Sequence, residues 1–285
     1  MLLNISQDHL DRYENFKEYI NSKWSIFKNQ NLSDKAVINT SIDGFEKKSQ
    51  KIKSNIISFS SCSQKPTGNK KVTHDKEYKE CNARITSRNI KIKLKTNEYN
   101  IPTENLKELE GIHNKENIAA AALASLAVGA DIQDVLKGIK NYKNLSHRME
   151  FVQTINNISF YNDSKATNTD AVIRALECFK KNIILILGGR EKSTDFSRLA
   201  NHIKKSVKTI IALGETSSTI KDTFGKICPV KIVQTMKDGV QTAFDLALKN
   251  DIVLLSPACA SFDMYDSYAH RGNDFTNCVK ALDKR

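Results

Sequence analysis

The sequence has no paired-cysteine motif and no long hydrophobic run, and these absences exclude several classes of protein. Its six cysteines are scattered along 285 residues without a C-x-x-C pair, so neither a disulfide framework nor a zinc site is expected. No window of about 18 apolar residues occurs, so we predict no transmembrane helix. The N-terminus, MLLNISQDHLDRY, lacks the basic flank and apolar stretch of a signal peptide. We therefore expect a cytoplasmic protein with no membrane partner.

A phosphate-binding P-loop is also missing, although residues 184–196, ILILGGREKSTDF, invite the comparison. A P-loop reads G-x-x-x-x-G-K-[ST], because its glycines let backbone N–H groups close around phosphate oxygens. Here the two glycine positions hold Ile186 and Glu191, and a carboxylate beside the lysine repels phosphate. Lys192 and Ser193 are then either an anion site at the start of a helix or part of a solvated loop.

Positive charge is abundant, with a formal net charge of +12, but its distribution does not favour nucleic-acid binding. Much of the excess lies between Lys47 and Lys95, and lysine dominates over arginine. Lysine solvates strand faces and edges, whereas arginine is the usual reader of bases and phosphates. A lysine-rich solvated surface explains the charge better, so we expect no nucleic-acid partner.

The hydrophobic pattern of the first half predicts a mixture of helices and short strands. Apolar residues recur at helical spacing in residues 14–30, and KAVINT and NIISFS indicate strands. Weak alternation in NIKIKLK indicates a surface hairpin, and HNKENIAAAALASLAVGA and DIQDVLKGIKNY indicate two helices.

The second half predicts a parallel, doubly wound α/β sheet of the Rossmann-like kind. Five apolar segments alternate with helix-length stretches: ISFYND, NIILILGG, TIIALG, VKIVQT and DIVLLSPA. The chain is long enough for two domains, which we place at residues 1–144 and 145–285.

Polar clusters follow three of these predicted strands: YNDSKATN at 161–168, GGREKS at 188–193 and SPACAS at 256–261. Because doubly wound sheets bind ligands at the carboxyl ends of their strands, the clusters are candidates for a shared site. Each also has a structural explanation when taken singly. Asp163 and Ser164 could cap a helix, and the third cluster could be a tight turn.

Isolated polar residues elsewhere carry less information. His9 and Lys23 lie before and within the first predicted helix, and a lone histidine is more often structural than a ligand. Asn114 and Asn117 open the alanine-rich helix, where asparagine commonly serves as a cap. Arg148 lies at the proposed domain boundary, where a solvated or ion-paired surface residue is the simplest interpretation.

The order of these motifs resembles the Mur ligases of peptidoglycan synthesis. In chain order the motifs are DHLDRY with a later lysine, HNxxN, HR, DSKATNxxA, GGxxKSxDF and SPACASFD…RGxxF. They extend over nearly the whole chain apart from the Lys-rich hairpin, and DSKATN and SPACASFD are the most specific. The likeness is greatest to the members that add D-glutamate to UDP-N-acetylmuramoyl-L-alanine.

The resemblance implies the latter part of a central ATPase domain followed by a complete C-terminal ligase domain. In the family a UDP-binding domain and a P-loop of the form GTNGK[ST] come first, and both would precede Leu2 here. The implied enzyme uses ATP and Mg²⁺ to join D-glutamate to UDP-N-acetylmuramoyl-L-alanine through an acyl phosphate. It would be a monomer, and this stretch alone would be inactive.

The same resemblance implies roles for individual residues. His9 would be a magnesium ligand, and Lys23, as a carbamate, would support a second magnesium, so both would be catalytic. Asn114 and Asn117 would face adenine. Ribose and phosphates would be held by three residues, of which the lysine is also catalytic: Arg148, Asp163 and Lys165.

D-Glutamate would bind in a pocket of the C-terminal domain. Lys192 would bind its side-chain carboxylate, and four other residues would line the pocket: Thr167, Ser193, Ser261 and Tyr268. The family often has phenylalanine at the position of Tyr268. Two other functions stay open at this level, namely a non-catalytic remnant that binds D-glutamate or nucleotide and a basic nucleic-acid-binding α/β protein.

Overall fold

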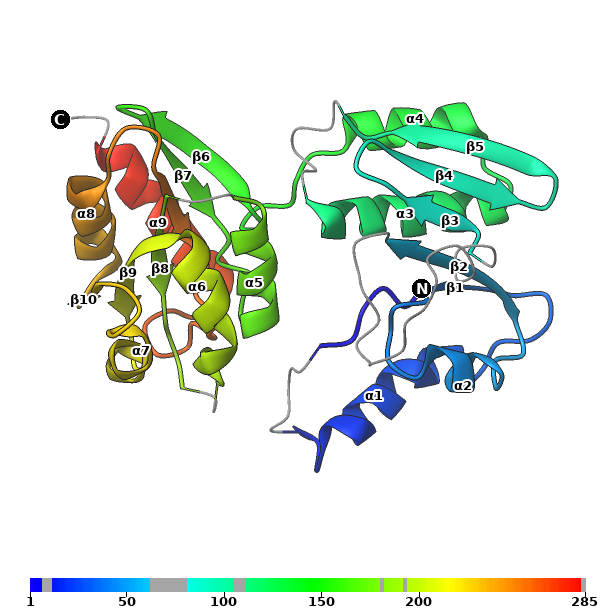
Figure 1. The fold of residues 1–285 in the computed structure, drawn as a ribbon, viewed down its shortest axis with the longest axis horizontal. Coiled ribbons are helices and arrows are strands. Elements are labelled where there is room, and N and C mark those ends of the chain that lie inside the picture. Colours follow the sequence, from blue (N-terminus) through cyan, green and yellow to red (C-terminus); the bar gives the residue numbers. More distant parts are fainter. Residues whose placement is uncertain (7–11, 62–80, 105–110, 180–181, 192–193, 283–285) are drawn as a thin grey trace. The chain divides into compact units, whose positions relative to one another are not determined.

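The computed structural model describes residues 1–6, 12–61, 81–104, 111–179, 182–191 and 194–282. The chain forms two compact units, Met1–Lys143 and Asn144–Arg285, which we call unit 1 and unit 2. Each unit has its own sheet and its own hydrophobic core (Figure 1). Within the described ranges, no helix combines the length and the apolar character that crossing a membrane requires.

Unit 1 is built on a five-stranded mixed sheet in the order β1-β2-β3-β4-β5. Three strands are parallel, β1 (Lys35–Asn39), β2 (Asn55–Ser61) and β3 (Ala83–Ile85). An antiparallel hairpin of β4 (Asn89–Leu94) and β5 (Asn97–Pro102) completes the sheet. The predicted strands and hairpin are confirmed. The hairpin is more than a surface feature, because Ile90 and Ile92 are buried in the core.

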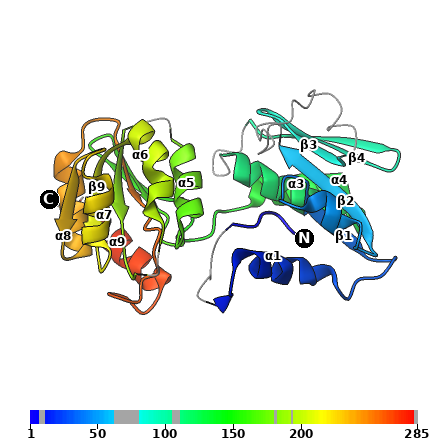
Figure 2. The same ribbon diagram turned by 60° about the horizontal axis from the view of Figure 1, so that its bottom comes forward.

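The helices of unit 1 lie on both faces of its parallel strands. They are α1 (Phe16–Trp24) with the short η2 (Ser25–Phe27), α2 (Phe45–Ser49), α3 (Ile112–Ala127) and α4 (Ile132–Asn141). Val37 of β1 packs in the cluster that contains the alanines of α3, whereas Ala36 and Ile38 pack with Trp24. Figure 2 shows α1 and α3 on opposite sides of β1.

Unit 2 is built on a six-stranded sheet in the order β10-β9-β8-β11-β7-β6. The five predicted strands are present and parallel: β7 (Ile158–Asn162), β8 (Ile183–Leu187), β9 (Val207–Leu213), β10 (Val230–Val233) and β11 (Ile252–Leu255). The sequence did not predict β6 (Glu150–Ile155), which pairs antiparallel with β7 and makes the sheet mixed.

Helices cover both faces of this sheet, as the doubly wound pattern predicts. Alternate residues of β8 show it: Ile183, Leu185 and Leu187 face one core cluster, and Ile184 and Ile186 face another. The first cluster includes α5 (Thr169–Glu177), η5 (Phe196–Leu199), α6 (Ala200–Ser206) and α7 (Ser217–Phe224). The second includes α8 (Met236–Leu246) and α9 (Tyr268–Leu282), which lie across the sheet from α5 and α6 (Figure 1).

The last strand of the chain, β11, is inserted between β7 and β8. Because β7, β8, β9 and β11 are parallel, the loops that follow them emerge at the same edge of the sheet. This edge carries the described parts of the three polar clusters named above, residues 161–168, 188–191 and 256–261.

We expect residues 144–285 to fold without unit 1, because they bury a core on each face of a complete sheet. Expressed alone, this segment should unfold in a single cooperative thermal transition, followed by circular dichroism. The full chain melted under the same conditions is the reference. A gradual, non-cooperative loss of signal from the isolated segment would show that unit 2 depends on unit 1.

Candidate functional site

The loops after β8, β9 and β11 pack so closely that glycine is required where they meet. Gly188 and Gly189 follow β8 with φ of +119° and +148°. A Cβ on Gly188 would lie 2.2 Å from the carbonyl oxygen of Leu213, and one on Gly189 would lie 2.4 Å from that of Ala260. Neither contact is sterically possible, so the glycine pair allows three loops to converge.

A buried arginine joins the loops after β7 and β11. Arg271 of α9 is 2 % exposed, and its Nε and Nη2 donate to Ser164 Oγ at 3.0 Å and Ser164 O at 2.9 Å. Nη2 also donates to Cys259 O at 3.1 Å, and Nη1 donates to Ala260 O at 3.3 Å. Burial lowers the pKa of Arg271 to about 10, so it stays a cation at neutral pH. The sequence contained this residue in the motif RGxxF, but nothing in the pattern assigned it a role.

Asp163 lies buried at the end of β7, between two hydrogen-bond donors. Its Oδ1 accepts from the backbone N–H of Met149 at 3.2 Å, and its Oδ2 accepts from Ser256 Oγ at 2.9 Å. Burial raises the pKa of Asp163 to about 7, against the opposing effects of these hydrogen bonds and of the Arg148 charge. The carboxylate is thus fixed in orientation while it keeps lone pairs for a ligand hydroxyl.

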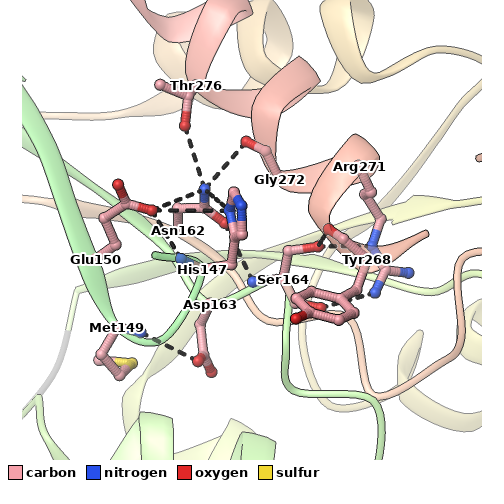
Figure 3. Close-up of polar contacts among 10 residues, drawn as sticks. All are labelled: His147, Met149, Glu150, Asn162, Asp163, Ser164, Tyr268, Arg271, Gly272 and Thr276. Atoms are coloured by element: carbon pink, nitrogen blue, oxygen red, sulfur yellow. Dashed lines mark hydrogen bonds and ion pairs between the residues drawn. The ribbon is translucent and has the colours of Figure 1, made fainter. Parts of the chain in front are cut away.

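The structure corrects the interpretation of Asp163 and Ser164 as helix caps. The N-cap of α5 is Asn168, whose side chain accepts from the backbone N–H of Ala171 at 2.9 Å. Asp163 and Ser164 instead bond to the segments around Met149 and Arg271 (Figure 3). Sequence spacing alone cannot distinguish a cap from a residue that bonds to a distant segment.

Lys165 and Tyr268 lie together, although the family resemblance implies different ligands for them. Lys165 Nζ is 3.8 Å from the centre of the Tyr268 ring, a cation–π distance. The backbone N–H of Lys165 donates to the carbonyl of His147 at 3.0 Å. Ser164 Oγ donates to the Tyr268 carbonyl at 2.8 Å, which ties the loop after β7 to the start of α9.

The remaining predicted residues of unit 2 occupy the same loops or lie outside the described residues. Thr167 is partly buried two residues after Lys165. Ser261 is buried, and its carbonyl accepts the backbone N–H groups of Met264 and Tyr265 at 3.1 and 2.8 Å. Outside the described residues lie three of the predicted residues, namely His9 of unit 1 and Lys192 and Ser193 of unit 2.

In unit 1 the predicted residues lie on two helices. Lys23 is exposed on α1, with Nζ 4.9 Å from the centre of the Tyr19 ring. Asn114 and Asn117 are three residues apart on α3, so they lie on the same side of that helix. The N-cap of α3 is Gly111, so the interpretation of the two asparagines as caps is wrong.

The chain matches two domains of one enzyme family. Residues 1–125 match the Mur ligase middle domain, and residues 147–259 match the Mur ligase glutamate ligase domain. The UDP-N-acetylmuramoylalanine--D-glutamate ligase of Desulfosudis oleivorans is 38 % identical over 282 residues. The enzyme of the same name from Clostridioides difficile is 36 % identical over 284 residues. The alignments cover 99 % of this chain but 58 % and 59 % of those relatives, so the chain spans little more than half their length.

Solved structures share the fold at low sequence identity. MurF from Acinetobacter baumannii aligns with a TM-score of 0.68 at 17 % identity, covering 96 % of this chain and 59 % of that one. A pseudomurein peptide ligase type C from Methanothermus fervidus also gives 0.68, at 15 % identity, covering 99 % of this chain and 63 % of that one. The chain matches two consecutive Mur ligase domains, has relatives with more than one third sequence identity and shares the fold of these solved structures. It therefore belongs to the Mur ligase family.

Proposed function

We propose that the chain is part of an ATP-dependent ligase that adds D-glutamate to UDP-N-acetylmuramoyl-L-alanine. Relatives named for that activity align with almost the whole chain. The observation that carries the proposal is the convergence of Asp163, Lys165 and Tyr268 at the carboxyl edge of the unit 2 sheet. Doubly wound sheets bind their ligands at this edge.

The donors and acceptors at this edge fit a nucleotide. Asp163 offers a fixed carboxylate to a ribose hydroxyl, and Lys165 and Arg148 offer positive charge to phosphates. Arg148 is exposed, and the next residue, Met149, donates its backbone N–H to Asp163 Oδ1, so Arg148 adjoins a residue that contacts this carboxylate. We also propose, from the family resemblance, that Asn114 and Asn117 of α3 in unit 1 face adenine. ATP would supply the phosphoryl group that activates a carboxylate for attack by an amine.

The described residues do not by themselves fit a metal ion. No group of three or more His, Cys, Asp or Glu side chains in the described ranges is placed to hold one. Lys23 would become a metal-binding group only as a carbamate, since an ammonium repels Mg²⁺. We propose Lys23 and His9 as magnesium-binding residues from the resemblance alone.

D-Glutamate would bind beside Lys165 and Tyr268, in the loops held together by Arg271. Its two carboxylates need cationic or hydroxyl donors, and the loops after β7 and β11 supply Thr167 and Ser261. We propose that Lys192 and Ser193, from the loop after β8, bind the side-chain carboxylate.

The test of this proposal is a titration of the isotopically labelled 285-residue chain with D-glutamate, followed by NMR. The backbone signals of Lys165, Thr167 and Ser261 should shift, and L-glutamate should produce much smaller shifts. Lys192→Ala should raise the Kd for D-glutamate roughly ten- to a hundredfold, because a charge-assisted hydrogen bond is lost.

The matched control is Lys221→Ala, which removes an exposed lysine of α7 and should leave the Kd unchanged. ADP binding should change little in Lys192→Ala, because this lysine is not proposed to contact phosphate. A loss of ADP binding with unchanged D-glutamate binding would contradict the assignment of Lys192. Equal responses to D- and L-glutamate would contradict the proposed substrate.

A further inference from the structure

The residues on either side of Arg148 adopt backbone conformations that non-glycine residues rarely adopt. His147 has φ of +64° and Met149 has φ of +47°. Each such residue costs free energy relative to the ordinary helical or extended regions, so surrounding contacts must hold it. The backbone of this short segment sets the direction of the Arg148 side chain, so contacts that hold the segment also orient Arg148.

Hydrogen bonds within unit 2 hold the backbone of the segment, and one of them runs from the N–H of Arg148 to the carbonyl of Leu145 at 3.2 Å. The N–H of His147 donates to Glu150 Oε2 at 2.8 Å, and its carbonyl accepts the N–H of Lys165 at 3.0 Å. The N–H of Met149 donates to Asp163 Oδ1 at 3.2 Å. The bonds to Lys165 and Asp163 lead to the loop after β7, which contributes the proposed nucleotide-binding residues.

The His147 ring is held by a buried asparagine that the motif analysis did not single out. Asn162, the last residue of β7, is fully buried, and its Nδ2 lies 3.0 Å from His147 Nδ1 (Figure 3). The same Nδ2 lies 3.0 Å from the Gly272 carbonyl and 3.2 Å from Thr276 Oγ1. The same Nδ2 also lies 3.4 Å from Glu150 Oε2, so Asn162 brings the His147 ring, β6 and α9 together.

A glycine inside α9 makes room for the ring. A Cβ at Gly272 would lie 2.3 Å from His147 Nδ1 and 3.0 Å from two ring carbons of His147. Glycine within a helix is unfavourable relative to alanine. Helix formation therefore does not explain Gly272, whereas the close approach of the His147 ring does.

We infer that Asn162 and Gly272 are positioning residues for nucleotide binding: they hold the His147 ring against α9 and thereby fix the segment that presents Arg148 beside Asp163. This inference rests on the proposed role of Arg148 in binding nucleotide. Neither Asn162 nor Gly272 needs to touch the ligand, because each acts through His147.

The first measurement is hydrogen exchange of the Met149 and Lys165 amides in the 285-residue chain, by NMR. Gly272→Ala and Asn162→Ala should each speed the exchange of both amides by roughly ten-fold, the effect of losing about one hydrogen bond. The control is Gln153→Ala, because Gln153 Nε2 also joins β6 to α9, through the Val279 carbonyl at 3.2 Å, but far from residue 148. Gly272→Ala keeps the test decisive if Asn162→Ala fails to fold.

The second measurement is a titration of the same proteins with ADP. Arg148→Ala should weaken ADP binding. Gly272→Ala should leave the segment correctly placed about a tenth of the time, which raises the Kd for ADP roughly ten-fold. Unchanged amide exchange in Gly272→Ala would overturn the inference whatever the ADP result. Faster exchange with wild-type ADP affinity would also overturn it, while leaving the proposed function intact. If Arg148→Ala itself binds ADP like the wild type, the proposed role of Arg148 fails, and the inference fails with it.

Discussion

Replacing Arg271 by alanine should destabilise unit 2 by about 3–5 kcal/mol. The substitution leaves a large buried cavity, and it removes the donors from Ser164 O, Ser164 Oγ and Cys259 O. Ala260 O loses one donor but keeps the backbone N–H of Arg190 at 2.9 Å. Urea unfolding followed by circular dichroism measures the change in the free energy of unfolding.

The matched control for Arg271 is Arg198, a partly exposed arginine of the same unit. Arg198 Nη1 and Nη2 bond to the two oxygens of Asp170 at 3.0 and 2.7 Å. Despite this good geometry, an exposed ion pair contributes only about 1 kcal/mol or less, so Arg198→Ala should have a small effect. Similar losses for the two variants would show that Arg271 does not organise the loops. Arg271→Lys should recover only part of the loss, because an ammonium cannot reach all the acceptors of a planar guanidinium.

Asp163→Asn should remove most of the pH dependence of the stability of unit 2 between about pH 4 and about pH 8. Burial raises the pKa of Asp163 from 3.8 to about 7 in the folded protein. The protonated form therefore stabilises the folded state below the unfolded pKa, and this contribution is lost as the pH rises through the folded pKa. The loss is on the order of 4 kcal/mol for a shift of this size. Asparagine does not titrate, so the variant lacks this contribution to the pH profile.

Urea unfolding of wild type and variant across this pH range tests the prediction. The amide that replaces the Asp163 carboxyl can still accept from the Met149 N–H through its oxygen and donate to Ser256 Oγ through its nitrogen. The control is Asp222→Asn, which changes an exposed carboxylate of α7 and should leave the pH profile unchanged. An equally steep pH profile in Asp163→Asn would show that the Asp163 carboxyl is not the group responsible.

The strands of unit 2 could be predicted because the signal for them is local. Buried runs such as Ile183–Leu187 are apolar at every position, and each is bounded by glycine or polar residues. β6 was missed because its pattern is not regular. Phe151 is 54 % exposed, and the pairing with β7 shifts register between Phe151 and Gln153. The bulge breaks the alternation by which a half-buried strand is recognised.

The candidate site was also predicted from the sequence only in part. The motifs placed Asp163, Lys165 and Tyr268 among the functional residues, and the structure brings them to one edge of a sheet. Arg271 and Asn162 had no role in the sequence analysis, because their roles depend on distant partners. Arg271 bonds to a residue 107 positions away, and Asn162 bonds to one 110 positions away. Local spacing cannot report contacts of this kind.

The central position of β11 has a consequence for how the protein is made. A chain that has been synthesised only as far as β10 already contains β7 and β8. It still lacks β11, the strand that lies between them in the sheet. During that interval both strands present unpaired backbone N–H and C=O groups, and such edges favour association with other chains. Closing the gap requires β11 to pair with β7, for example Ile252 with Ser159, and with β8, for example Ile252 with Ile183. Such pairing between segments distant in sequence is slow, because loop closure precedes the favourable contacts. A ribosome that stalls between β10 and β11 would therefore release a product prone to aggregation, even though most of the sequence of unit 2 is already present.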